Sequence, residues 1–91
     1  MSAPEERTSL LTFPCDFPIK VMGKRVDTFA QEIAAVIAVH APDFDPARME
    51  MRASSGGNYL SLTCHVVATS QSQLDDIYRA LTSHPLVSVV L

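Results

Sequence analysis

YLSLTCHVVAT, residues 59–69, is the stretch that decides the fold. Apolar residues recur at every second position, and a period of two is typical of a β-strand with one buried face. The predicted inward set is Leu60, Leu62, Cys64, Val66 and Ala68. The predicted outward set is Tyr59, Ser61, Thr63, His65, Val67 and Thr69. The stretch therefore predicts a strand of a sheet that has one face on a core and the other face open.

Immediately upstream, SSGGN at residues 54–58 separates this strand from a second alternating segment, residues 48–53. That segment is predicted to turn Met49, Met51 and Ala53 inward and Arg48, Glu50 and Arg52 outward. A phosphate-binding loop would need glycines that lead from a strand into a helix, whereas these glycines join two strands. Gly56, Gly57 and Asn58 tolerate the positive φ of tight turns, so they predict a β-hairpin.

The first part of the chain predicts a strand followed by a helix. Residues 15–23 alternate again, with Phe17, Ile19 and Val21 on the predicted inner side and Lys20 on the outer side. Over residues 28–41 the period lengthens, and one helical stripe collects Phe29, Ile33, Val36, Ile37 and His40. Thr28 and Gln31 have the spacing of a capping box at its start, and Pro42 follows its end.

The last part repeats this arrangement. Ser70 and Gln73 form a second capping-box pattern, and the helix that follows carries Leu74, Ile77, Tyr78 and Leu81 on its buried stripe. The segment Ser83-His84-Pro85 closes the helix. LVSVVL, residues 86–91, predicts a final β-branched strand.

The element order is therefore β-α-β-β-α-β. Right-handed crossovers interleave the two halves into a four-stranded antiparallel sheet of order 4-1-3-2 with both helices on one face. The fold class is α+β, a ferredoxin-like sandwich. Residues 1–13 are predicted to be a partly flexible N-terminal tail, and residues 14–91 a single domain.

The face of the sheet away from the helices is the first candidate binding surface. It is predicted to carry Lys20, Arg48, Arg52, Tyr59 and His65. RNA-recognition modules of this fold stack bases on several aromatic residues, but here only Tyr59 is available. A net charge of -3 also disfavours nucleic acid. An RNA-binding module is therefore the alternative, ranked below a protein partner.

The second candidate is the corner between the first strand and the first helix. Gly23, Lys24 and Arg25 are predicted to lie in this connection, where modules of this fold admit a small molecule. Arg25 could hold an oxyanion, as in acylphosphatases, which are the enzymatic alternative. The loop lacks the further glycines needed to wrap a phosphate, and no catalytic residues are identified. We therefore predict a non-enzymatic protein.

No metal site or cofactor is predicted. Cys64 and His65 are adjacent on a strand and so point to opposite faces. The two cysteines, Cys15 and Cys64, are predicted to be free thiols in a reducing compartment. The chain contains neither a run of apolar residues that could cross a bilayer nor a signal-peptide pattern, which predicts a cytoplasmic protein without membrane contact.

The last strand predicts self-association. LVSVVL is apolar on both faces and belongs to a strand at the border of the sheet. Such an edge is normally covered or paired. One prediction is a homodimer through this sheet edge; the other is that LLTF, residues 10–13, covers the edge.

Together these segments resemble the YbeD-like family of small bacterial proteins of unknown function. The resemblance rests on FPCDFPIKVMG (13–23), HAPDF (40–44), SSGGNYLSLT (54–63) and the terminal LVSVVL. It implies a ferredoxin-like domain similar to ACT-type regulatory domains, which bind small molecules and pair through their sheets. It also implies a regulatory or interaction role with a link to lipoate metabolism, and it supplies no catalytic residues. The chain departs from the family in having Gly56-Gly57 where a charged residue commonly precedes a single glycine.

Overall fold

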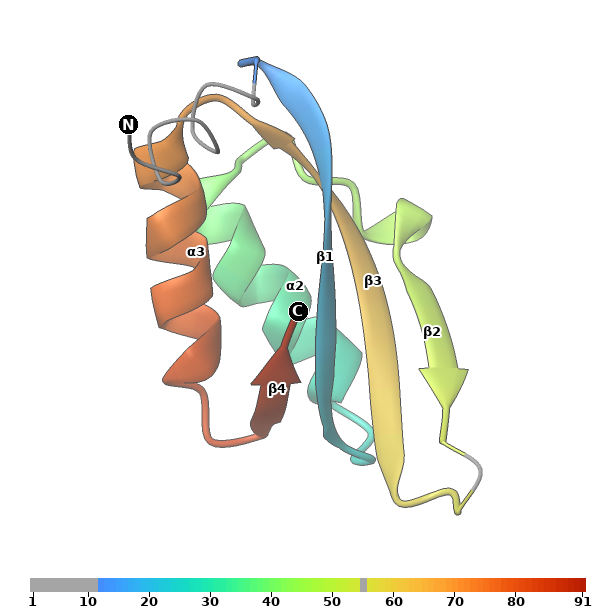
Figure 1. The fold of residues 1–91 in the computed structure, drawn as a ribbon. Helices are drawn as coiled ribbons and strands as arrows, with labels where there is room; N and C mark the ends of the chain where they lie inside the picture. The colour runs from blue at the N-terminus through green and yellow to red at the C-terminus, as the bar shows by residue number, and fades with distance from the viewer. Residues whose placement is uncertain (1–11, 55) are drawn as a thin grey trace, which may run out of the picture.

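The computed structural model describes residues 12–54 and 56–91. Its elements are β1 (Cys15–Lys24), α2 (Phe29–His40), the 3-10 helix η1 (Pro46–Arg48), β2 (Glu50–Ala53), β3 (Tyr59–Ala68), α3 (Gln71–Thr82) and β4 (Val87–Val90). The strands form one antiparallel sheet of order β2-β3-β1-β4, and both helices lie on the same side of it (Figure 1). The predicted ferredoxin-like fold is confirmed.

The register of the two central strands follows from their alternation. β1 and β3 pair from Cys15↔Ala68 to Lys24↔Tyr59. Inward residues meet inward residues in this pairing, because Val21 lies opposite Leu62 on the helix side and Lys20 opposite Thr63 on the open side. A shift by one residue would move the whole apolar set into solvent, so the burial pattern fixes this register.

The core lies between the sheet and the two helices. The fully buried side chains are Ile19, Val21, Phe29, Ile33, Ile37, Leu62, Cys64, Val66, Leu74, Ile77 and Leu81. All of these lie at predicted inner positions of β1 and β3 or on the predicted stripes of the helices. Five other predicted inward residues of these elements are only partly buried: Phe17, Val36, His40, Leu60 and Tyr78. Burial of this apolar surface is the main favourable contribution to folding.

Two predictions for the segment at residues 48–53 are wrong. β2 begins at Glu50, and Arg48 belongs to η1 instead of the strand. Met51 shares a face with the buried Leu62, yet 61% of its surface is exposed. The reason is the position of β2 at the border of the sheet, where a groove separates it from Val26 and Ala30 near the start of α2. The helices therefore do not cover Met51.

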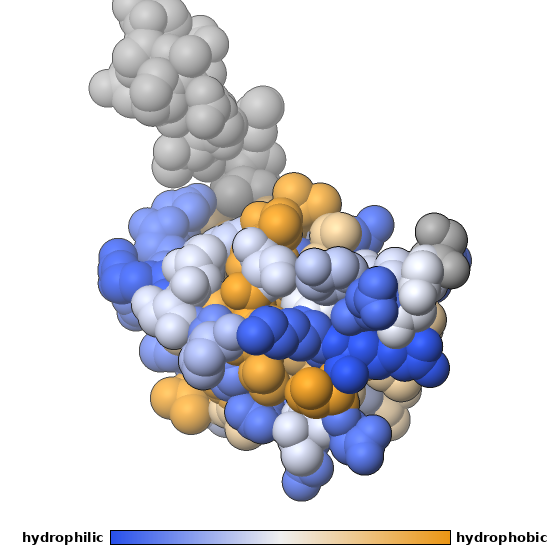
Figure 2. Space-filling model, turned by 90° about the horizontal axis from the view of Figure 1, so that it is seen from below, coloured by the Kyte–Doolittle hydropathy of each residue, from blue (hydrophilic) through white to orange (hydrophobic). Residues whose placement is uncertain are grey.

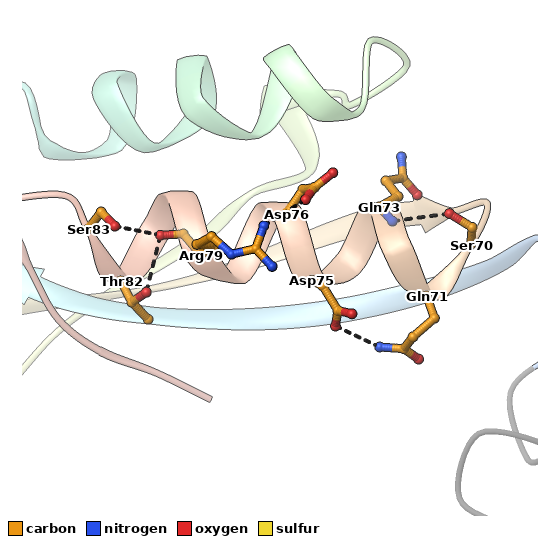
Figure 3. Close-up of polar contacts among 8 residues, drawn as sticks. All are labelled: Ser70, Gln71, Gln73, Asp75, Asp76, Arg79, Thr82 and Ser83. Carbon is orange, nitrogen blue, oxygen red and sulfur yellow. Dashed lines mark hydrogen bonds and ion pairs between the residues drawn. The ribbon is translucent and has the colours of Figure 1, made fainter. Parts of the chain in front are cut away.

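The two capping patterns have different outcomes. The Ser70 Oγ accepts a hydrogen bond from the Gln73 backbone N–H at 3.1 Å, as predicted, and the bond is visible in Figure 3. In a capping box the Gln73 side chain would bond to the Ser70 backbone N–H. Here it reaches one residue further back, and its Oε1 accepts a hydrogen bond from the Thr69 backbone N–H at 2.7 Å. Thr28 makes no capping bond, and the prediction of a capping box there is wrong. Its φ of -92° and ψ of 0° are not extended, so its hydroxyl instead donates to Glu32 Oε2.

This difference gives a matched pair of variants. We expect Ser70→Ala to lower the free energy of unfolding by about 1 kcal/mol, because it removes an N-cap acceptor. Thr28→Ala should cost clearly less, since the Thr28 hydroxyl contacts only an exposed carboxylate. Urea denaturation of both variants measures the difference. Equal losses for the two would contradict the capping assignment.

Candidate functional site

The open face of the sheet carries the predicted partner surface. A depression of about 300 Å³ is lined there by Lys20, Glu50, Met51, Arg52, Ser61 and Thr63. Lys20 comes from β1, Ser61 and Thr63 from β3, and Arg52 from β2. Tyr59 borders a neighbouring depression of about 160 Å³ together with Met22 and Arg52. The structure thus brings Lys20, Arg52 and Tyr59 to one part of the face.

His65 and Arg48 form a separate cluster with acidic side chains on this face. The Nδ1 of His65 lies 3.9 Å from Asp16 Oδ2, and its Nε2 lies 3.6 Å from Glu50 Oε2. Arg48 Nη2 lies 4.0 Å from the same Asp16 oxygen. The cluster spans β1, β3 and β2, so it links the strands across the sheet. Its residues are partly or largely exposed to solvent, and such pairs contribute little to stability.

Lys20 and Arg52 differ from this cluster. Among residues 12–54 and 56–91, no carboxylate lies within 4.0 Å of either side chain. Glu50, the acidic residue in the same depression, is directed at His65. An ammonium or guanidinium beside hydroxyl groups can bind an anionic group through charge-assisted hydrogen bonds. This part of the open face therefore has the chemistry of an anion-binding surface.

The second candidate, the corner at Gly23, Lys24 and Arg25, is filled by the protein beside Gly23, but a groove of about 260 Å³ lies beside Arg25. Its other lining residues are Val26, Asp27, Ala30, Met51 and Leu60. Gly23 and Lys24 belong to β1, so the prediction that they lie in the connecting loop is wrong. A Cβ on Gly23 would lie 2.2 Å from the Leu86 carbonyl oxygen and 2.6 Å from Cε1 of Phe29. Gly23 is thus required for close packing of the chain.

Arg25 contacts the β2–β3 hairpin. Its Nη1 donates to the Gly57 carbonyl at 3.2 Å, and its backbone N–H donates to the Asn58 carbonyl at 3.2 Å. Sequence reasoning missed this contact, because the residues are far apart in the chain and form no motif. Figure 2 views this end of the molecule from below and shows hydrophilic side chains with apolar areas between them. Through its two hydrogen bonds, Arg25 joins the β1–α2 connection to the β2–β3 hairpin.

The predicted hairpin is confirmed for its described residues; residue 55 lies outside them. The Gly57 N–H donates to the Ser54 carbonyl at 2.9 Å, and the Ser54 N–H donates to the Tyr59 carbonyl at 3.0 Å. Gly57 has a φ of 75°, the left-handed region that glycine adopts without steric cost. This conformation explains why a glycine stands at position 57.

We expect Gly57→Ala to lower the free energy of unfolding by about 1 kcal/mol, because a side chain is strained at this φ. Its Cβ would also lie 3.2 Å from the Arg25 Nη1 atom. Gly56→Ala is the matched control, since its Cβ would meet only the Asn58 Nδ2 at 3.7 Å. Thermal unfolding compares the two variants. A larger loss for Gly56→Ala would show that the turn is wrongly placed.

His84 has a role that sequence reasoning missed. Its Nδ1 accepts a hydrogen bond from the Leu86 N–H at 3.1 Å, so the geometry assigns a proton to Nε2. That Nε2 lies 3.1 Å from Glu32 Oε1. His84 thus ties the α3–β4 connection to α2. Spacing alone suggested only that His84 meets the end of the second helix, because nothing in the sequence pairs it with Glu32.

The cysteines differ in burial. Cys64 is buried in the core, and burial raises the pKa of its thiol to about 12. A thiol that stays protonated at neutral pH is a poor nucleophile. Cys15 is half-buried, and both cysteines are free. Within the described ranges, no three His, Cys, Asp or Glu side chains are grouped to hold a metal ion. The helices there include none with the length and apolar character to span a membrane.

Fold and open face together define a small α+β domain of ferredoxin-like topology, with both described helices on one side of its sheet. Residues 8–91 match the model of a family described as "Protein of unknown function (DUF493)", and the chain belongs to that family. The match confirms the resemblance to small YbeD-like bacterial proteins of unknown function.

Similar proteins are found in several bacteria. A UPF0250 protein of Ralstonia nicotianae is 58% identical over 89 residues, which are 98% of this chain and 92% of the relative. A UPF0250 protein of Bordetella pertussis is 59% identical over 88 residues, 97% of this chain and 94% of the relative. The solution structure of protein HP0495 from H. pylori covers 89% of this chain and 85% of its own, with a TM-score of 0.73 and 16% identity. At that identity the likeness shows the fold alone.

Proposed function

We propose that this protein is a non-enzymatic regulatory module that binds an acidic segment of a partner protein on the open face of its sheet. The observation that carries the proposal is Lys20. Its side chain stands near the middle of the face that the helices do not cover, and no carboxylate of the described residues lies within 4.0 Å of it. Unpaired cations of this kind attract carboxylates of a partner and orient it during encounter.

The surroundings of Lys20 support a protein partner. Thr63 lies directly opposite Lys20, and Ser61 follows on the same face of β3. Their hydroxyls can donate to carboxylate or carbonyl oxygens. Tyr59, which is 50% exposed, adds an aromatic surface of the kind that is enriched at protein interfaces. A cation, two hydroxyls and an aromatic ring provide both the charge and the apolar contact that a peptide segment needs.

The alternatives have less support. At the corner, the ring of Phe29 and the Leu86 carbonyl occupy the space beside Gly23, and Arg25 is bonded to the hairpin. A small molecule or an acyl phosphate at Gly23 would have to compete with these contacts, and the groove beside Arg25 is lined in part by the acidic Asp27. RNA binding would rest on Tyr59 as the aromatic platform, against a net charge of -3. A cytoplasmic location and a link to lipoate metabolism stay predictions.

The test is affinity capture from a bacterial extract with the immobilised protein, read by quantitative mass spectrometry and by nucleic-acid staining. Wild type is compared with Lys20→Glu and with Arg79→Glu, which makes the same charge change at an exposed position of α3. We expect proteins held by wild type and by Arg79→Glu to fall by about tenfold on Lys20→Glu, because like charges then face each other.

The capture experiment also separates the alternatives. Proteins retained equally by all three baits would contradict the open-face proposal. RNA that is retained by wild type and lost on Tyr59→Ala would replace the protein partner with the nucleic-acid alternative.

A further inference from the structure

The border strand β2 has a free edge that is not part of the proposed partner surface. All four of its residues are exposed, and it stands at one end of the strand order. In Figure 1 no described element lies beyond it. An unpaired strand edge is a template for pairing with another chain.

The hydrogen bonds of β2 show which backbone groups are available. The Ser54 N–H bonds to the Tyr59 carbonyl, and the register continues through Arg52↔Ser61 and Glu50↔Thr63. In an antiparallel pair, successive residues bond alternately to one side and the other. Glu50 and Arg52 therefore use their backbone groups toward β3, whereas those of Met51 and Ala53 point to the free edge.

The side chains of β2 are self-complementary. We propose that two copies of this protein form a two-fold dimer in which β2 pairs antiparallel with β2 of the second copy, with Met51 opposite Met51. This register places Glu50 of each copy opposite Arg52 of the other, on the open face. Opposite charges facing each other across strands stabilise a pair, and like charges destabilise it.

Charge disfavours the two neighbouring registers that would also keep the inner faces together. Pairing Met51 with Met49 places Glu50 opposite Glu50, and pairing Met51 with Ala53 places Arg52 opposite Arg52. A shift by a single residue would place Met51 opposite Glu50 or Arg52 of the second copy, so that the inner face of one copy would continue into the open face of the other. The sequence Glu-Met-Arg therefore favours one register for a two-fold pairing of the strand with itself.

Two further observations agree with this dimer. In one copy, Arg52 has no carboxylate within 4.0 Å among the described residues; the dimer supplies one. Met51 is 61% exposed beside a groove of about 260 Å³ that Val26, Ala30 and Leu60 help to line. A second copy would cover this apolar surface. β4, the edge on which the sequence predicted pairing, offers Val-Ser-Val-Val and no such charge pair.

The dimer does not depend on the proposed function. Lys20, Ser61 and Thr63 lie on β1 and β3 and not on the β2 edge. Arg52 lines the same depression and would face Glu50 of the second copy, but the proposed function rests on Lys20. Failure of the dimer would leave the capture experiment unaffected, and failure of the capture experiment would leave the oligomeric state unaffected.

The test is a charge exchange followed by sedimentation velocity over a range of concentrations. Wild type should be dimeric. Glu50→Lys alone and Arg52→Glu alone each create two pairs of like charges, so each should raise the dissociation constant by about tenfold or more. An equimolar mixture of the two variants should dimerise again, because both cations of the Glu50→Lys chain then face glutamates of the Arg52→Glu chain.

Controls make the result decisive. Val89→Lys places a charge on the other border strand and should leave the dimer intact. Circular dichroism checks that each variant is folded. If Glu50→Lys does not fold, the dissociation constant of Arg52→Glu alone tests the proposal. Three results would overturn the proposal: a wild type that stays monomeric at NMR concentrations, a dimer lost on Val89→Lys, or a mixture of the folded charge variants that fails to associate.

Discussion

Replacing Gly23 with alanine should lower the free energy of unfolding by about 3 kcal/mol, the upper range for overpacking a core. The added Cβ would lie 2.2 Å from the Leu86 carbonyl oxygen, a backbone atom, and 2.6 Å from Cε1 of the Phe29 ring. The same carbonyl accepts the Lys24 N–H at 3.1 Å. The Leu86 carbonyl cannot move away from the added Cβ without breaking this hydrogen bond, which joins β1 to the residue that precedes β4.

Urea denaturation of Gly23→Ala measures this loss, and Gly56→Ala serves again as the control because its position is open. The control should change the free energy of unfolding by less than about 0.5 kcal/mol, as is usual for surface substitutions. If both variants unfold at the same urea concentration, the close approach of β1, Phe29 and Leu86 does not exist in solution.

The second large effect is expected for Phe29→Ala, with a loss of about 4 kcal/mol. Phe29 is the first residue of α2 and is fully buried. Truncation removes its apolar contacts and leaves a cavity against β1 at Gly23. Val39→Ala, on the same helix but with 76% of the valine exposed, is the control and should cost little. Thermal and urea unfolding of the two variants provide the comparison.

A double variant tests whether the two positions act together. Once the ring of Phe29 is gone, two of the three nearest atoms to the Cβ added by Gly23→Ala are removed, and the Leu86 carbonyl oxygen remains. The combined loss in Gly23→Ala/Phe29→Ala should therefore be smaller than the sum of the single losses, by about 0.5 kcal/mol or more. Strict additivity would mean that the two residues do not touch.

Much of the fold could be predicted because a one-sided sheet imposes strict alternation. Residues 59–69 and 15–23 show this pattern, and their register follows from it once the strand order is known. The capping of α2 could not be predicted in the same way. Thr28 and Ser70 stand in the same motif, but Thr28 follows a tight connection in which the Val26 N–H bonds to Lys24 and the Phe29 N–H bonds to Val26. Those turns set its backbone away from the extended conformation that a cap requires.

The sequence could predict which residues of the candidate site lie on the open face, but not which side chains contact each other there. Alternation identified Lys20, Tyr59 and His65 as outward residues. It could not show that Glu50 is directed at His65, which leaves Lys20 without a carboxylate among the described residues. Nor could it show that the helices fail to cover Met51, because periodicity assigns a face without saying how far the second layer extends. Predictions for residues 1–11, including the covering of the β4 edge by Leu10 and Leu11, lie outside the described residues.

The most direct test of the account is the reactivity of the chain's two lysines, Lys20 and Lys24, in the captured complex. Both side chains are exposed in the free protein, and they lie about 13 Å apart along β1. An amine-labelling reagent is applied to the free protein and to the complex, and labelling is read by mass spectrometry. If an acidic segment of a partner binds the open face around Lys20, labelling of Lys20 falls sharply in the complex, and by more than that of Lys24. Labelling of Lys20 at the same rate in the complex as in the free protein would contradict the proposed binding surface.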